Sequence, residues 1–116
     1  HPHVVQPIEL IPHTDYATRH AVVYSLGNYV SNMSIPHSTV GLAVELTIEK
    51  MPHATRLKSF DYRLVWTERA ALSRKGDFRI VPEDTVPEDI APEAQRHMQQ
   101  AIKVERELLD AASCKK

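Results

Sequence analysis

The sequence predicts an α+β fold, built mainly from antiparallel strands and closed by one helix near the C-terminal end. Two segments, 39–49 and 57–67, alternate apolar and polar residues with a period of two, which is typical of half-buried antiparallel strands. Residues 92–112 instead place apolar residues at spacings of about 3.6, the pattern of an amphipathic helix. The 116 residues suffice for one domain, or for part of a larger one.

The first elements expected are two short strands joined by a polar loop. Apolar runs at 8–11 and 21–26 flank the polar segment 12–19, and β-branched runs bounded by Pro and Asp signal strands. Because residues 21–26 are apolar at consecutive positions, we expect both faces of that strand to be buried, as in a central strand. Gly27 and Asn28 tolerate positive φ and favour an abrupt turn at its carboxyl end.

The two alternating segments are predicted to form a hairpin, because only the short connector Met51-Pro52-His53-Ala54 separates them. A further strand is expected at 78–81, after the turn-like residues 74–77. One face of the second segment carries four apolar residues, which favours a structural core over a sugar-stacking platform. These residues are Phe60, Tyr62, Leu64 and Trp66.

The sequence becomes rich in proline and acidic residues from Pro82. Three prolines between 82 and 92 exclude a regular element there, whereas Pro92 suits the first turn of a helix and Glu93 lies near its positive dipole end. Both signs of charge on the polar face favour a helix that closes the sheet over one that lies on a membrane. Its predicted packing face comprises Met98, Ala101, Ile102, Leu108, Leu109 and Ala112.

Composition excludes several classes of function. The 14 Lys and Arg residues against 15 Asp and Glu residues give a net charge of -1 and no electrostatic argument for a nucleic-acid partner. No stretch approaches the roughly 20 apolar residues of a transmembrane helix. The single Cys114 excludes an internal disulfide framework and a cysteine-based zinc cluster. The three glycines form no phosphate-binding loop.

Histidines are the main chemical resource of the chain. The spacing of His1 and His3 is compatible with metal binding. Residues i and i+2 of an extended backbone point to one side, where two imidazoles can bind one metal or two adjacent metals. Pro2 favours extended geometry in the residue before it. From spacing alone a chance His-x-His remains the more common interpretation. We expect four other histidines to be solvent-exposed: His13, His20, His53 and His97.

The beginning of the sequence predicts that this is a piece of a longer protein. His1-Pro2-His3 contains no initiating Met, and no charged segment followed by an apolar one, as in a signal peptide, is present. We therefore expect a fragment whose remainder lies upstream of His1.

Two motifs carry a resemblance to a known family. Residues 1–9 read HPHVVQPIE, and residues 23–32 read VYSLGNYVSN. In this order and at this separation, the motifs resemble the C-terminal portion of the CapA family of bacterial capsule or poly-gamma-glutamate synthesis proteins. Tyr29 stands where the family usually has Phe. The resemblance is strong through about Asn32 and loose beyond it.

The resemblance implies a fold and a metal site. The family is similar to calcineurin-like metallophosphatases, so residues 1–116 would be the C-terminal portion of one four-layered α-β-β-α sandwich. His1 and His3 match the last metal-ligand block, and Asn28 matches a signature Gly-Asn. The resemblance implies two divalent metal ions, Mn, Fe or Zn, in the intact protein. The family's Asp, Gly-Asn and Asn-His ligand blocks would lie upstream of His1.

The function implied is the synthesis or export of an anionic surface polymer at the bacterial cell envelope, outside the cytoplasm. The implied partners are the missing N-terminal portion of the domain and an anionic polymer or phosphoester substrate. When intact, the protein would be a metal-dependent phosphoesterase-type hydrolase, while the present segment alone is not expected to be active and its catalytic residues are unassigned. One alternative is a non-catalytic polymer-binding or assembly module. Another is a small α+β domain with incidental histidines.

Overall fold

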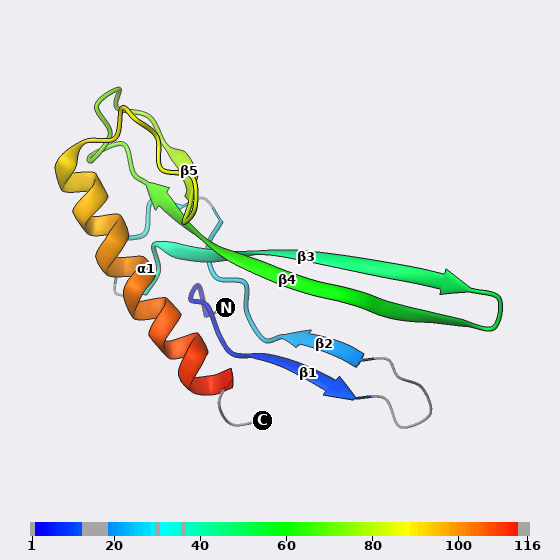
Figure 1. The fold of residues 1–116 in the computed structure, drawn as a ribbon. Coiled ribbons are helices and arrows are strands. Elements are labelled where there is room, and N and C mark those ends of the chain that lie inside the picture. Colours follow the sequence, from blue (N-terminus) through cyan, green and yellow to red (C-terminus); the bar gives the residue numbers. More distant parts are fainter. Residues whose placement is uncertain (1, 13–18, 30, 36, 114–116) are drawn as a thin grey trace.

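A computed structural model describes residues 2–12, 19–29, 31–35 and 37–113, which contain five strands and one helix (Figure 1). All of the strand pairs are antiparallel, and the helix follows the last strand. The predicted α+β class is thereby confirmed. In chain order the elements are β1 (Ile8–Pro12), β2 (Arg19–Val23), β3 (Val40–Met51), β4 (Ala54–Glu68), β5 (Arg79–Pro82) and α1 (Pro92–Ser113).

The main sheet is built on the predicted hairpin. Strands β3 and β4 pair from Val40 opposite Trp66 to Met51 opposite Ala54, so the turn between them is only two residues long. Strand β5 pairs with the last residues of β4, which gives the order β3-β4-β5. The hairpin and the third strand are therefore confirmed. Helix α1 crosses the base of the hairpin, while the turn end projects far beyond it (Figure 1).

Strands β1 and β2 form a separate two-stranded sheet beside the hairpin. Among the strands that the structure describes, β2 pairs with β1 alone. Tyr24 and Leu26, at the end of the apolar run, are 55% and 50% exposed. The prediction of a central strand with both faces buried is therefore wrong for the described chain. Consecutive apolar residues indicate a preference for burial, but no described strand reaches the second edge of β2.

The core lies where α1 packs on the base of the sheet. Leu64 is fully buried and Trp66 is 2% exposed, which confirms the structural prediction for these two residues, whereas Phe60 and Tyr62 are only partly buried. The well-packed residues come from the segment before β1, the beginning of β3, the end of β4, β5, and the segment that leads into and through α1. They are Val5, Val40, Leu42, Leu64, Trp66, Val81, Ile90, Ala94, Met98 and Leu109.

The packing face of α1 differs in part from the prediction. Met98 and Leu109 are buried as expected, but Leu108 is 54% exposed. The buried stripe instead passes through Ala94 and the acidic Glu105, which lie at helical spacing with Met98 and Leu109. Leu108 falls to one side of that stripe, so the prediction is wrong at this position. The side chain of Ala112 lies outside what the structure describes.

The outer half of the hairpin is an uncovered apolar face. Leu46 and Ile48 continue the inward face of Val40 and Leu42, yet they are exposed, contrary to the expectation of a half-buried strand along its whole length. The Cα radius of gyration is 16.7 Å, against about 13 Å for a compact domain of this length. The projecting hairpin therefore has a sheet face that no described element covers.

An arginine joins the end of β4 to the segment that precedes α1. The Nε atom of Arg79 lies 2.7 Å from Oε1 of Glu68, which is 1% exposed, and its Nη1 atom lies 3.0 Å from Oδ1 of Asp89. The hydrogen bond from Arg79 holds the pKa of Asp89 below its ordinary value of 3.8. The arrangement ties the proline-rich segment to the sheet.

This network predicts a pH-dependent contribution to stability. Because the pKa of Asp89 is lowered on folding, its interaction with Arg79 stabilises the protein above the ordinary carboxyl pKa and is lost as the pH falls through the lowered value. We expect the free energy of unfolding to fall less steeply on acidification in Asp89→Asn than in the parent. Urea denaturation between about pH 5 and pH 2 measures this difference.

The matched control for Asp89 is Asp77→Asn. Asp77 is exposed and makes no ion pair in the part of the chain that the structure describes. Its replacement is expected to leave the acid limb of the stability profile unchanged. Identical profiles for Asp89→Asn and the parent would contradict the assigned interaction.

Candidate functional site

The predicted turn after residues 21–26 passes directly over the beginning of β3. Gly27 has a φ of 71°, which confirms the need for a residue that tolerates positive φ. Gly27 forms an isolated antiparallel bridge with Gly41, and the amide of Leu42 donates to the carbonyl oxygen of Leu26 at 2.8 Å. The backbone of this turn is therefore held against the sheet, which fixes the position of Asn28.

The side chain of Asn28 is oriented by its hydrogen bonds. Its Nδ2 donates to the carbonyl oxygen of Ser38 at 3.0 Å and lies 3.4 Å from the Met33 sulfur. A carbonyl oxygen only accepts, so the amide nitrogen must face Ser38. Oδ1 of Asn28 then faces the His3 ring, 3.0 Å from its Nδ1. The structure thus brings together two of the predicted site residues that are 25 positions apart.

This contact assigns the tautomer of His3. Oδ1 of Asn28 cannot donate, so Nδ1 of His3 carries the hydrogen and donates it. In the neutral ring the lone pair then belongs to Nε2. Metal-bound histidines usually donate their other ring N–H to an oxygen in this way, which fixes the ring and raises its basicity. The His3–Asn28 pair therefore has the chemistry of an imidazole ligand with its supporting residue.

The backbone of His3 is not extended. Its φ of 57° lies in the left-handed region, which histidine adopts more readily than most residues. The predicted extended His-x-His geometry is therefore wrong at this residue, and His3 reaches Asn28 from a bend. His1 lies outside the described residues.

The two motif segments contact each other along their length. Val5 bridges Leu26 in antiparallel fashion, and the hydroxyl of Tyr24 donates to Oε1 of Glu9 at 2.8 Å. This hydrogen bond to Glu9 raises the pKa of Tyr24. Together with the His3–Asn28 hydrogen bond, these contacts join the first motif to the second at three places along the chain.

The described residues do not by themselves form a metal site. Within 2–12, 19–29, 31–35 and 37–113, no three His, Cys, Asp or Glu side chains are grouped to hold a metal ion. A catalytic zinc ion takes three protein ligands, and a pair of metals needs more. His3 therefore fits as one ligand of a centre that would require further groups.

The other histidines lie in varied settings. His20 and His53 are exposed as expected, although His20 belongs to β2 and not to a loop. His97 is exposed on α1, as predicted, and also lines a cavity. His13 lies outside the described residues.

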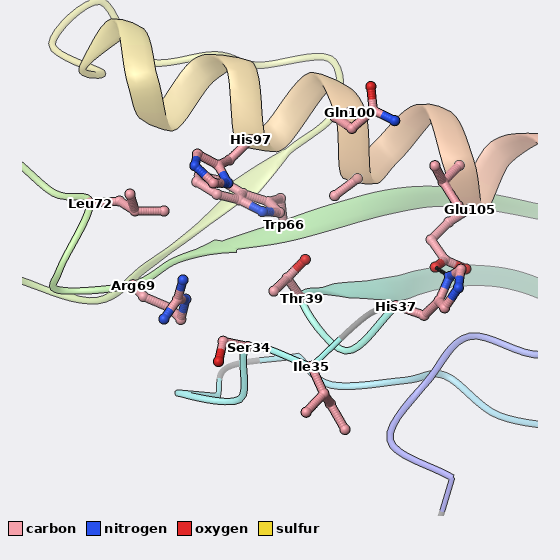
Figure 2. Close-up of a pocket in the computed structure, with 12 residues that line it drawn as sticks. Ser34, Ile35, His37, Thr39, Trp66, Arg69, Leu72, His97, Gln100 and Glu105 are labelled. Atoms are coloured by element: carbon pink, nitrogen blue, oxygen red, sulfur yellow. Dashed lines mark hydrogen bonds and ion pairs between the residues drawn. The ribbon is translucent and has the colours of Figure 1, made fainter.

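The structure contains a cavity that the sequence patterns did not predict. It has a volume of about 550 Å³ and lies between α1, residues 34–39 and the segment that follows β4 (Figure 2). At one end, Nδ1 of His37 is 2.6 Å from Oε1 of the buried Glu105. The two residues are 68 positions apart, so no local spacing indicates the pair. The available signal was Glu105 itself, an acidic residue on the apolar stripe of the helix.

Comparison with models of known protein families, with curated proteins and with solved structures found no match. In the described residues, α1 has no stretch that is both long and apolar enough to cross a bilayer, in agreement with the prediction from the sequence.

Proposed function

We propose that the chain is the C-terminal portion of a CapA-like protein that acts in the synthesis or export of an anionic polymer at the bacterial cell envelope. The proposal starts from the resemblance of residues 1–9 and 23–32 to that family. One observation supports it: the two motif segments lie against each other, and His3 donates a hydrogen bond to Asn28. These contacts continue the register of the β1–β2 hairpin, in which Ile8 lies opposite Val23, so the hairpin holds the two motifs side by side as a shared site would require.

The proposal includes a larger fold than the described chain. In a four-layered sandwich the two sheets pack face to face, and each buries its inner side chains against the other. The exposed Leu46 and Ile48 continue the buried face of β3 and offer a surface for such packing. The first partner of this chain would thus be the N-terminal portion of the same domain.

The proposed metal centre would use His3 and His1, together with ligands from the rest of the domain. A bound Mn, Fe or Zn ion would supply Lewis-acid polarisation of a phosphoryl group. Asn28 would act on His3 alone, because it accepts the Nδ1 hydrogen and fixes the orientation of the ring. Under this proposal the intact protein is a phosphoesterase-type hydrolase.

Removal of His3 tests the metal centre. The intact protein is purified without chelator and with Mn, Fe and Zn supplied, and its metal content is measured by elemental analysis. We expect His3→Ala to lose bound metal, and Asn28→Ala to bind it about 10–100-fold more weakly, as is typical when the partner of a ligating histidine is removed. His53→Ala is the matched control, because His53 is exposed in the β3–β4 turn. It should keep the parent metal content.

Circular dichroism of each variant establishes that it is folded before its metal content is compared. If the parent holds no metal, or if His3→Ala holds the same amount as the parent, the metallophosphatase function is wrong for this protein. A non-catalytic polymer-binding or assembly module would then be the better account of the same resemblance.

A further inference from the structure

The cavity beside α1 is separate from the His3–Asn28 pair, since neither residue lines it. Its walls come from three parts of the chain, and Figure 2 shows their side chains around one space. Helix α1 contributes His97 and Gln100, and the segment after β4 contributes Arg69. Trp66, which is almost completely buried, forms the base. The volume of about 550 Å³ is in the range of sites for small organic ligands.

Arg69 places a positive charge on one wall of this cavity. Its side chain is partly buried, and no carboxylate pairs with it in the part of the chain that the structure describes. The two buried glutamates that could have done so are engaged elsewhere. Glu68, its neighbour in sequence, is paired with Arg79, and Glu105, across the cavity, is paired with His37.

Apart from Glu105, whose carboxylate contacts His37 at the other end of the cavity, the remaining polar groups on the walls add hydrogen-bond donors. His97 lies 3.9 Å from Glu93, but both side chains are exposed, so the interaction is weak. Gln100 offers an amide and Ser34 a hydroxyl. Away from Glu105, a ligand therefore meets one guanidinium and several neutral or weakly paired donors, which is an environment for an anionic group.

The rest of the lining is apolar. Figure 2 shows Leu72 and Ile35 at different edges of the group of lining side chains, and Ala101 and Val104 come from α1. Because the charged group is confined to one wall, a free inorganic ion would leave most of this surface in contact with water. An anion with an apolar body would bury it.

We propose that this cavity binds a small organic carboxylate. The carboxylate lies on the guanidinium of Arg69, whose planar fork can donate two parallel hydrogen bonds to its two oxygens. The apolar body packs between Trp66, Leu72 and Val104. A single carboxylate matches the single unpaired arginine on the wall.

Titration of the intact protein with 3-phenylpropionate tests the proposal. We expect saturable binding by calorimetry, with weaker binding of 3-phenylpropan-1-ol, which lacks the charge, and of inorganic phosphate, which lacks the apolar body. Arg69→Gln is expected to raise the dissociation constant at least about tenfold, the effect of losing one charge-assisted hydrogen-bonded contact. Arg74→Gln, at an exposed position in the turn before Gly76, is the matched control and should bind as the parent does.

The variant His3→Ala separates this proposal from the metal centre, because it should bind 3-phenylpropionate with the parent affinity. If Arg69→Gln fails to fold, Arg69→Lys keeps the charge without the planar fork and is still expected to lose affinity. The proposal is overturned if the folded parent shows no saturable binding, or if the folded arginine variant binds as tightly as the parent. Equally tight binding of the alcohol or of phosphate also overturns it.

Discussion

Replacement of Trp66 by alanine is expected to lower the free energy of unfolding by about 3–5 kcal/mol, as for other large aromatic residues in a core. Trp66 is 2% exposed and lies near the end of β4, in the core between the sheet and α1. Since a domain is usually stable by only about 5–15 kcal/mol, this loss removes a large part of the total. Urea denaturation followed by far-ultraviolet circular dichroism measures the change.

Phe60→Ala is the matched control, because Phe60 lies on the same face of β4. Its ring is only partly buried and its centroid lies 6.4 Å from that of Tyr62, in the outer half of the hairpin. Its removal is expected to cost about 1 kcal/mol. If Phe60→Ala and Trp66→Ala destabilise the protein equally, the core cannot be concentrated at the base of the hairpin.

The elements of this fold were predictable because their signals are local. Alternation with a period of two runs through both long strands, and it ends at a connector that contains Pro52. Pro92 and the change to helical spacing gave the beginning of α1. Each signal depends on neighbouring residues alone, so it could be read without the tertiary structure.

The depth of burial along each strand was not predictable in this way. Val40 and Ile48 occupy the same face of β3 and have similar side chains, yet the first is fully buried and the second is 62% exposed. Alternation indicates which face points inward, but it does not indicate how far the covering helix extends. Since α1 crosses only the base of the hairpin, the outer apolar residues remain uncovered (Figure 1).

The same distinction between local and tertiary signals applies to the candidate sites. His3 and Asn28 could be singled out from their motifs, but their contact and the resulting tautomer depend on a turn that places residues 25 positions apart together. The cavity depends on a still longer connection, from His37 to Glu105. Its lone arginine is recognisable only because the structure shows which glutamates are already paired.

The backbone of Asn28 lies very close to Gly41 of β3, and this contact predicts one effect on stability and another on the candidate metal site. A Cβ atom on Gly41 would lie 2.3 Å from the carbonyl oxygen of Asn28. That oxygen belongs to the backbone, so it cannot rotate away as a flexible side chain could. We expect Gly41→Ala to lower the free energy of unfolding by about 3 kcal/mol, the upper part of the range for overpacking. The shift should also move Asn28 away from His3.

Gly76→Ala distinguishes this crowding from the general effect of replacing glycine. Gly76 has a φ of 73° but no atom within 4 Å of an added Cβ, so its replacement is expected to cost only about 1 kcal/mol through the left-handed backbone. Urea denaturation gives the stabilities, and the ring ¹⁵N chemical shifts of His3 report whether Nδ1 still donates to Asn28. We expect these shifts to change in Gly41→Ala and to stay constant in Gly76→Ala. The prediction is contradicted if Gly41→Ala is as stable as Gly76→Ala and its His3 shifts are unchanged. The turn would then not press on β3, and the orientation of His3 would have another cause.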